Sequence, residues 1–136
     1  MEITTENTEG TEGFANNSIT EAIIGAAIEV HRELGPGLLE SVYEKCLAFE
    51  LADREFRVAV QQEIPVRYKG LVFECGFRAD LLVNETVLIE LKAIDLILPV
   101  HTAQVLTYLK LASLKTGLLI NFNVPLLKQG IKRVSL

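Results

Sequence analysis

Tryptophan, cysteine and long apolar runs are all scarce in this 136-residue chain. Tryptophan is absent, and the two cysteines, Cys46 and Cys75, have neither the CxxC spacing nor that of zinc ligands. We expect both to be reduced residues of a core in a cytoplasmic protein. No basic, apolar leader opens the chain, and no apolar run approaches the roughly 20 residues that a bilayer requires. No secretion and no membrane span are therefore expected.

A surplus of positive charge is also missing. The chain has 13 basic and 18 acidic residues, a net charge of −5. Four glutamates in residues 1–17, which contain no lysine or arginine, supply four of the negative charges, so −5 + 4 leaves −1 for residues 18–136. A free-standing nucleic-acid binder usually has a basic surplus. The nearly neutral body therefore counts against tight, unaided binding of nucleic acid.

The composition predicts one folded domain behind a polar tail. Residues 1–17, rich in Thr, Glu, Asn and Gly, are predicted to be a disordered acidic tail. Residues 18–136 are predicted to form a single domain, because 49% hydrophobic residues supply a sizeable core. Ser18 and Glu21 have the spacing of a capping box and predict a first helix that ends near Leu34.

The next elements are a helix and three strands. A break at Gly35, Pro36 and Gly37 precedes a helix over 38–53. Strands are predicted over 58–68, 71–83 and 86–93, with a hairpin turn at 69–70. Pro65 places the first strand at an edge, and the apolar run 87–91 places the third in the centre. The buried side of the helix is predicted to consist of Leu39, Val42, Tyr43, Cys46 and Phe49.

The remaining pattern predicts an α/β fold with a mixed central β-sheet flanked by helices. Pro99 suits the first residue of a helix over 99–114, and Gly117 suits its stop. A short strand over 118–121 would then lie parallel to the strand before the helix, because strand–helix–strand units pair in this way. A last strand is expected over 131–136.

The candidate metal-binding and catalytic residues are charged side chains in the central hairpin. Glu90 and Lys92 are two apart on one strand and point to the same face, among apolar neighbours. Charges in such a strand are costly unless they are paired or bind an ion. A two-residue loop at 84–85 would set Asp80 opposite Ile89, on the wrong face. A three-residue loop over 84–86, or a bulge, would set Asp80 opposite Glu90.

If Asp80 faces Glu90, two carboxylates and the Leu91 carbonyl converge on one point. Hard oxygen ligands of this kind suit Mg²⁺ or Mn²⁺. Lys92 could orient or deprotonate an attacking water, or stabilise developing charge. The alternative is a structural salt bridge of Lys92 with Glu90 or Asp80.

The same residues resemble the signature of the PD-(D/E)XK nuclease superfamily. Asp80 matches the acid, and Glu90, Leu91 and Lys92 match E-x-K, although Ala79 replaces the proline of the name. Gly37, Glu40 and Tyr43 resemble the motif of the bacterial GxxExxY family. The stretch 104–108 resembles the Q-x-x-x-Y motif of RecB-like members. The resemblance spans about residues 19–134 and implies a restriction-endonuclease-like core.

The resemblance also implies roles for individual residues. Glu40 would join Asp80, Glu90 and the Leu91 carbonyl at the metal, although it could instead serve the helix dipole. Gln104 would hold Lys92, a water or a phosphate, and Tyr108 would contact the nucleic-acid backbone. His31 is a candidate ligand or substrate contact, although a packed histidine is the simpler interpretation. Tyr43 could equally be a core residue with a bonded hydroxyl.

Three functions are compatible with these patterns. The resemblance favours a divalent-metal-dependent nuclease that hydrolyses phosphodiester bonds of DNA. A non-catalytic nucleic-acid-binding or regulatory module that kept the fold is the alternative. A homodimer or protein partner, with a charged cluster that is only structural, is the third.

Overall fold

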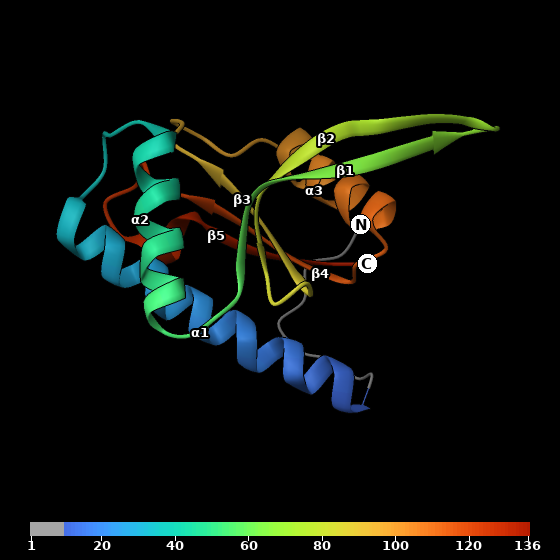
Figure 1. Cartoon of the computed structure of the whole chain (residues 1–136). Helices are drawn as coiled ribbons and strands as arrows, with labels where there is room; N and C mark the ends of the chain where they lie inside the picture. The colour runs from blue at the N-terminus through green and yellow to red at the C-terminus, as the bar shows by residue number, and fades with distance from the viewer. Residues whose placement is uncertain (1–9) are drawn as a thin grey trace.

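A five-stranded mixed sheet forms the centre of the molecule in the computed structural model, which describes residues 10–136 (Figure 1). The strands follow one another across the sheet in chain order, and every neighbouring pair is antiparallel except β3 and β4, which are parallel. The α/β class, the mixed sheet and the parallel pair are therefore confirmed. The strands are β1 (Val58–Tyr68), β2 (Leu71–Val83), β3 (Val87–Lys92), β4 (Thr116–Asn121) and β5 (Ile131–Ser135).

Helices cover both faces of this sheet (Figure 1). Helices α1 (Gly10–Leu34) and α2 (Glu40–Asp53) pack on one face and bury the larger core cluster. Helix α3 (Pro99–Ala112) packs on the other face over a smaller cluster. A short 3₁₀ helix, η1 (Leu127–Gly130), precedes β5.

The hairpin and edge predictions follow from local chemistry and are confirmed. Lys69 and Gly70 both have positive φ (46° and 92°), as the two central residues of a type I′ turn require. Strand β1, which contains Pro65, lies at the edge of the sheet, where a missing N–H costs least. Strand β3 lies in the centre, and its residues 87–91 are all buried.

The end of α3 differs from the prediction. The helix ends at Ala112, and Ser113 takes the left-handed conformation (φ 59°) that was expected of Gly117. Gly117 lies in β4 instead, where a Cβ atom would sit 3.0 Å from Val105 Cγ1. Glycine is needed there because α3 packs closely against the strand, not because a helix stops.

The first helix begins earlier than predicted. Residues 1–9 of the predicted tail lie outside the described residues, but residues 10–17 belong to α1. Ser18 is therefore an exposed residue inside the helix, and the capping-box prediction is wrong. Asn16 holds this part of the helix against the sheet, because it is buried and its Nδ2 donates a hydrogen bond of 3.1 Å to Thr116 Oγ1 on β4.

Two predictions based on apolar residues also need correction. Cys75 is exposed on the β1–β2 hairpin and does not belong to the core; both cysteines are free. Of the residues predicted on the buried side of α2, Leu39, Val42 and Phe49 are exposed (72%, 36% and 71%), whereas Leu47 and Leu51 are fully buried with Tyr43. None of the helices within residues 10–136 combines the length and the apolar character needed to cross a membrane.

Candidate metal and catalytic site

The β2–β3 loop has the three-residue length that brings Asp80 and Glu90 together. Val83 pairs with Val87, and Leu81 with Ile89, so the loop is 84–86. Continuing this register sets Asp80 opposite Glu90. Asn84 and Glu85 take left-handed conformations (φ 52° and 59°), and the Asn84 side chain accepts a hydrogen bond from Arg57 N. The two-residue alternative is therefore wrong.

Asp80 is oriented by two hydrogen bonds. Its Oδ2 accepts the backbone N–H of Leu91 at 2.8 Å, and its Oδ1 accepts Gln61 Nε2 at 3.0 Å. The N–H and C=O of one residue point to the same side of a strand. The Leu91 carbonyl consequently points to the side of β3 on which the Asp80 carboxylate lies.

Glu90 is a buried carboxyl group with an unused oxygen. The residue is 8% exposed, and its Oε1 is fully buried without a hydrogen-bond partner among residues 10–136. Burial, followed by the negative charge of Asp80, raises the pKa of Glu90 from 4.5 to about 8. A buried oxygen without a partner is unfavourable. Either a proton or a cation would relieve the cost, so the donor set fits a hard divalent cation.

Lys92 shares the face of Glu90, but its side chain forms no ion pair or hydrogen bond in the described part of the chain. Its side chain is half-buried, and its positive charge opposes the upward shift in the pKa of Glu90. The structural salt bridge with Glu90 or Asp80 is thus not formed. The ammonium group remains available to a water or a phosphate.

Helix α2 contributes acidic residues from the other side. Glu40, in the first turn, is exposed, and its negative charge adds to the raised pKa values of Glu90 and Glu44. Glu44, one turn later, is linked to the site by a hydrogen bond, because its Oε1 accepts the N–H of Gln61 Nε2 at 2.6 Å. Burial is the largest cause of the raised pKa of Glu44. Within residues 10–136, no three His, Cys, Asp or Glu side chains lie close enough to hold one ion.

Gln61 is the residue that sequence reasoning missed. It lies on β1 between the pairs Val60–Leu81 and Gln62–Ala79, opposite Asp80, and its φ of 51° is rare in a strand. Its amide donates to both Glu44 and Asp80 and so joins α2 to β2. No motif in the sequence marks this residue. Its conformation, which carries a cost, is typical of functional sites.

Helix α3 brings Tyr108 to the same place. The Tyr108 ring stacks on Phe77 of β2, with ring centroids 4.1 Å apart. Burial raises the pKa of the Tyr108 hydroxyl, and the charges of Glu90 and Asp80 raise it further. Gln104, one turn earlier on the same helix face, is exposed, and its side chain forms no hydrogen bond within residues 10–136.

Tyr43 has a structural role at the start of α2. Its hydroxyl donates to Gly35 O at 2.6 Å and accepts the N–H of Leu38 at 3.1 Å, and its buried ring stacks on Phe122 at 4.4 Å. Gly35 and Gly37 have positive φ (74° and 98°), which glycine adopts without strain. The loop and the tyrosine together fix where α2 begins, and hence where Glu40 and Glu44 lie.

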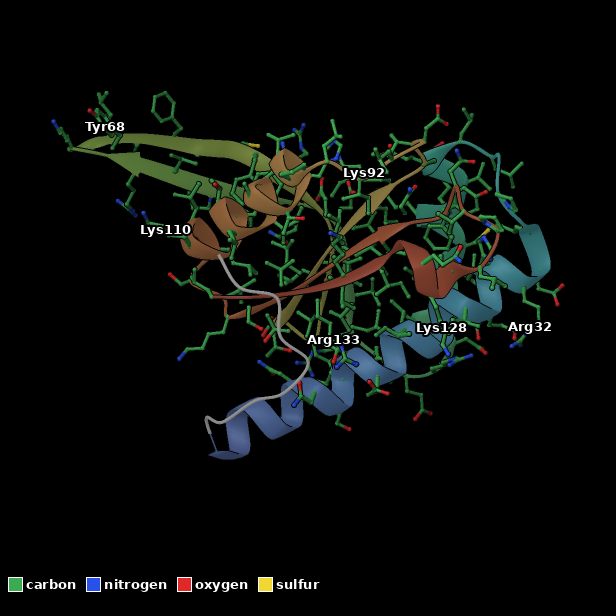
Figure 2. The ribbon with its side chains drawn as sticks, turned by 180° about the vertical axis from the view of Figure 1, so that it is seen from behind. Arg32, Tyr68, Lys92, Lys110, Lys128 and Arg133 are labelled. Atoms are coloured by element: carbon green, nitrogen blue, oxygen red, sulfur yellow. The ribbon has the colours of Figure 1, made fainter. Side chains whose placement is uncertain are left out.

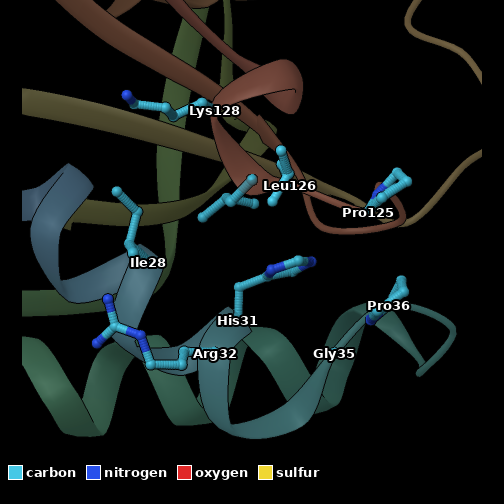
Figure 3. A pocket seen from close by; sticks show the side chains of 9 residues that line it. Ile28, His31, Arg32, Gly35, Pro36, Pro125, Leu126 and Lys128 are labelled. Atoms are coloured by element: carbon cyan, nitrogen blue, oxygen red, sulfur yellow. The ribbon is translucent and has the colours of Figure 1, made fainter.

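His31 is not brought to the carboxylates. Its Nε2 donates to Val124 O at 2.9 Å, and it lines a separate pocket of about 460 Å³ between the end of α1 and residues 125–128 (Figure 3). Neither Asp80 nor Glu90 lines this pocket. The packed interpretation of His31 fits this placement better than a ligand role.

Comparison with known proteins agrees with this arrangement. No curated protein and no solved structure matches the chain. The family model of the PD-(D/E)XK nuclease superfamily matches residues 17–134. That match covers most of the chain and includes every residue of the candidate site. The mixed sheet between helices is also consistent with the restriction-endonuclease-like core of that superfamily. The chain therefore belongs to the PD-(D/E)XK nuclease superfamily.

Proposed function

We propose that this chain is a divalent-metal-dependent nuclease that hydrolyses phosphodiester bonds of DNA. The observation that carries the proposal is the buried, unpartnered oxygen of Glu90 on the strand opposite Asp80. Two carboxyl groups in this arrangement repel each other unless a proton or a cation lies between them. Membership of a nuclease superfamily supports the cation.

Asp80, Glu90 and the Leu91 carbonyl would hold Mg²⁺ or Mn²⁺, both of which prefer oxygen ligands. Such an ion lowers the pKa of a bound water and neutralises charge on a phosphoryl oxygen. We assign Glu40 to an outer position, where its carboxylate adds negative charge. Glu44 and Gln61 hold the carboxylate of Asp80 in place.

Lys92 would act on the water or on the phosphate. The proposed reaction forms a bond between the water oxygen and phosphorus and breaks one phosphorus–ester oxygen bond, in line. Lys92 orients the water or, as the neutral amine, accepts its proton, or as the ammonium stabilises the negative charge that develops on the phosphoryl oxygens; the leaving ester oxygen takes up a proton from solvent. Gln104 and Tyr108, which lie on the same face of α3, would contact the phosphate backbone beside the reacting group.

We also propose that the chain belongs to the GxxExxY family and is related to the RecB-like branch, acting in the cytoplasm. Support for this finer assignment comes from Tyr43, whose hydroxyl ties down the loop that contains Gly37. The side-by-side positions of Gln104 and Tyr108 on α3 add to it.

A non-catalytic nucleic-acid-binding or regulatory module is the second candidate. The observation in its favour is charge, since residues 18–136 have a net charge of only −1 after the four tail glutamates are removed from −5. A homodimer or protein partner could supply the missing positive surface.

Cleavage assays separate these candidates. The full chain is incubated with linear duplex, circular duplex and single-stranded DNA and with RNA, each with Mg²⁺, Mn²⁺ or a chelator. The proposed function predicts DNA cleavage that requires the metal and is about 10³-fold slower in Lys92→Ala. Cleavage at an unchanged rate in Lys92→Ala would come from a contaminant. No cleavage of any substrate, together with no metal binding, would favour the non-catalytic module.

A further inference from the structure

The distal part of the β1–β2 hairpin, residues 64–73, projects beyond α3 as a two-stranded ribbon, which we call the arm (Figure 1). Tyr68 lies at its tip, well away from the labelled Lys92 and Lys128 (Figure 2). All residues from 67 to 76 are exposed. Isolated two-stranded ribbons are only marginally stable in water. A binding partner would therefore stabilise an exposed arm of this kind.

One face of the arm is apolar. Val66 pairs with Phe73, and Tyr68 with Leu71, and paired residues point to the same face. Tyr68 and Leu71 are each 59% exposed and Phe73 is 52% exposed, so no described part of the chain covers them. Nearer the body, past the register shift between Ile64 and Val66, Phe77 of the same strand stacks on Tyr108. The exposed apolar strip thus leads directly to the candidate site.

The arm is also basic in an acidic chain. Arg67 and Lys69 are the only charged residues between Glu63 and Glu74. The whole chain has a net charge of −5, so the part outside these two residues carries −5 − 2 = −7. Lys69 Nζ lies 5.4 Å from the centre of the Tyr68 ring. Aromatic and basic side chains side by side are suited to a partner that offers both negative charge and flat apolar surfaces, as nucleic acid does.

The position of the arm relates it to the proposed substrate. Strands β1 and β2, which form the arm, carry Gln61 and Asp80 at its base. Lys69 lies eight positions beyond Gln61, about 26 Å of extended strand. A nucleic acid with a phosphodiester at Asp80 that runs in the direction of these strands would pass along the arm. The major groove of B-form DNA accepts a two-stranded ribbon, whereas that of A-form RNA is too narrow.

We propose that the arm binds in a groove of double-stranded DNA beside the candidate site. Tyr68, Leu71 and Phe73 contact base edges and thymine methyl groups, and Arg67 and Lys69 contact phosphates. The location of the cleaved bond rests on the proposed function, but binding by the arm does not.

A second copy of the chain fits the apolar face of the arm less well than DNA does. The exposed parts of Tyr68, Leu71 and Phe73 amount to roughly 350 Å², against about 800 Å² per partner in a stable dimer. Two arms placed face to face would also bring together two basic tips that contain no acidic residue. The charge of the tips therefore favours DNA, whose phosphates are negative.

The test measures binding of the full chain to a fluorescein-labelled 24-base-pair DNA duplex by anisotropy, in EDTA so that metal-dependent cleavage does not occur. One variant combines Tyr68→Ser and Phe73→Ser, and a second combines Arg67→Gln and Lys69→Gln. The matched controls are Leu126→Ser, at a residue 64% exposed elsewhere, and Lys128→Gln with Lys132→Gln. Thermal melting verifies that each variant folds, which is expected because the substituted side chains are exposed.

The apolar arm variant is expected to bind the duplex at least tenfold more weakly. The charge variant is expected to bind more weakly and to reduce the slope of log affinity against log salt by about two. The controls should stay within about twofold of the unmodified chain.

Duplex affinity that does not change in either arm variant would overturn the proposal, as would loss of affinity for single strands alone. A dimer in light scattering that the arm variants dissociate, at unchanged DNA affinity, would assign the arm to a second copy. The two proposals fail separately. Cleavage of DNA by arm variants that bind normally would reject the arm and keep the nuclease, whereas arm-dependent binding without metal-dependent cleavage would reject the nuclease and keep the arm.

Discussion

The β1–β2 hairpin joins two regions that differ in burial although they share the same strands. At its base, Ala79, Leu81 and Val83 are fully buried, and Asp80 between them is fixed by hydrogen bonds from Gln61 and Leu91. At its tip, Leu71 is 59% exposed and has no core to pack against. Burying a polar group at the base costs free energy unless its partner is placed to within a fraction of an ångström. Side chains positioned so closely are suited to an ion site. Exposure leaves the tip free for a partner.

The largest expected effect concerns the chemistry at the base. Lys92→Ala removes the ammonium group beside Glu90 and should lower the rate of DNA cleavage by about 10³-fold, the usual size for a group that stabilises charge or moves a proton. Metal affinity should change little, because Lys92 is not among the proposed ligands. Single-turnover cleavage and calorimetry measure the two quantities. The matched control is Lys110→Ala, an exposed lysine on α3, which should cleave normally.

Truncating one leucine in each region tests the difference in burial directly. Leu81→Ala should lower the free energy of unfolding by about 2–5 kcal/mol, because it leaves a cavity in the core. Leu71→Ala, on the same strand, should change it by less than about 0.5 kcal/mol. Urea denaturation measures both. Similar losses in the two variants would mean that the arm is packed in solution.

Gln61 should matter more for the metal than for the fold. Gln61→Ala removes both hydrogen bonds to Glu44 and Asp80, and loss of such a supporting contact typically weakens metal binding by about 10–100-fold. Manganese affinity by calorimetry is the readout, with Gln62→Ala on the same strand as the control. An unchanged affinity would show that Asp80 holds its position without this amide.

Tyr43→Phe tests the clamp at the start of α2. The substitution leaves Gly35 O and Leu38 N without their partner and should cost about 1–2 kcal/mol of unfolding free energy. The melting temperature should fall by several degrees. Tyr68→Phe, which removes an exposed hydroxyl at the tip, should leave the melting temperature unchanged. Equal melting of the two variants would contradict the structural role of Tyr43.

The effect of pH is the most gradual. In the metal-free protein the pKa of Glu90 is raised from 4.5 to about 8, so between these values the folded chain keeps a proton that the unfolded chain has released. Stability should therefore fall as pH rises through this window, by at most about 1.4 kcal/mol per pH unit, and level off above it. Glu90→Gln should remove this slope. A stability that rises through the window in the unmodified chain would contradict the buried carboxyl group.

Periodicity and turn chemistry predicted the fold because they act locally. The bounds of β1 and β2 follow from the Lys69–Gly70 turn, and the central position of β3 follows from its unbroken apolar run. Contacts between distant residues were beyond such reasoning. The bond from Asn16 to Thr116 holds the early part of α1 against the sheet, and the buried side of α2 is set by its packing on α1 and the sheet, which leaves Phe49 outside.

The candidate site, too, could be predicted from the sequence only where local geometry determines it. The positions of Glu90 and Lys92 on one face follow from strand geometry alone. The side on which Asp80 falls depends on a loop length that the sequence left open between two and three residues. Gln61 and Glu44 could not be found, because their link to Asp80 depends on a left-handed residue in an edge strand and on the docking of α2.

Calorimetric titration of Mn²⁺ into the full chain at pH 8.5, where Glu90 is largely ionised, is the most direct test of the proposed ion site between Asp80 and Glu90. We predict saturable binding of Mn²⁺ by the unmodified chain and its loss in Asp80→Asn, with the fold of that variant intact by circular dichroism. No binding by the unmodified chain, or equal binding by Asp80→Asn, would contradict the site.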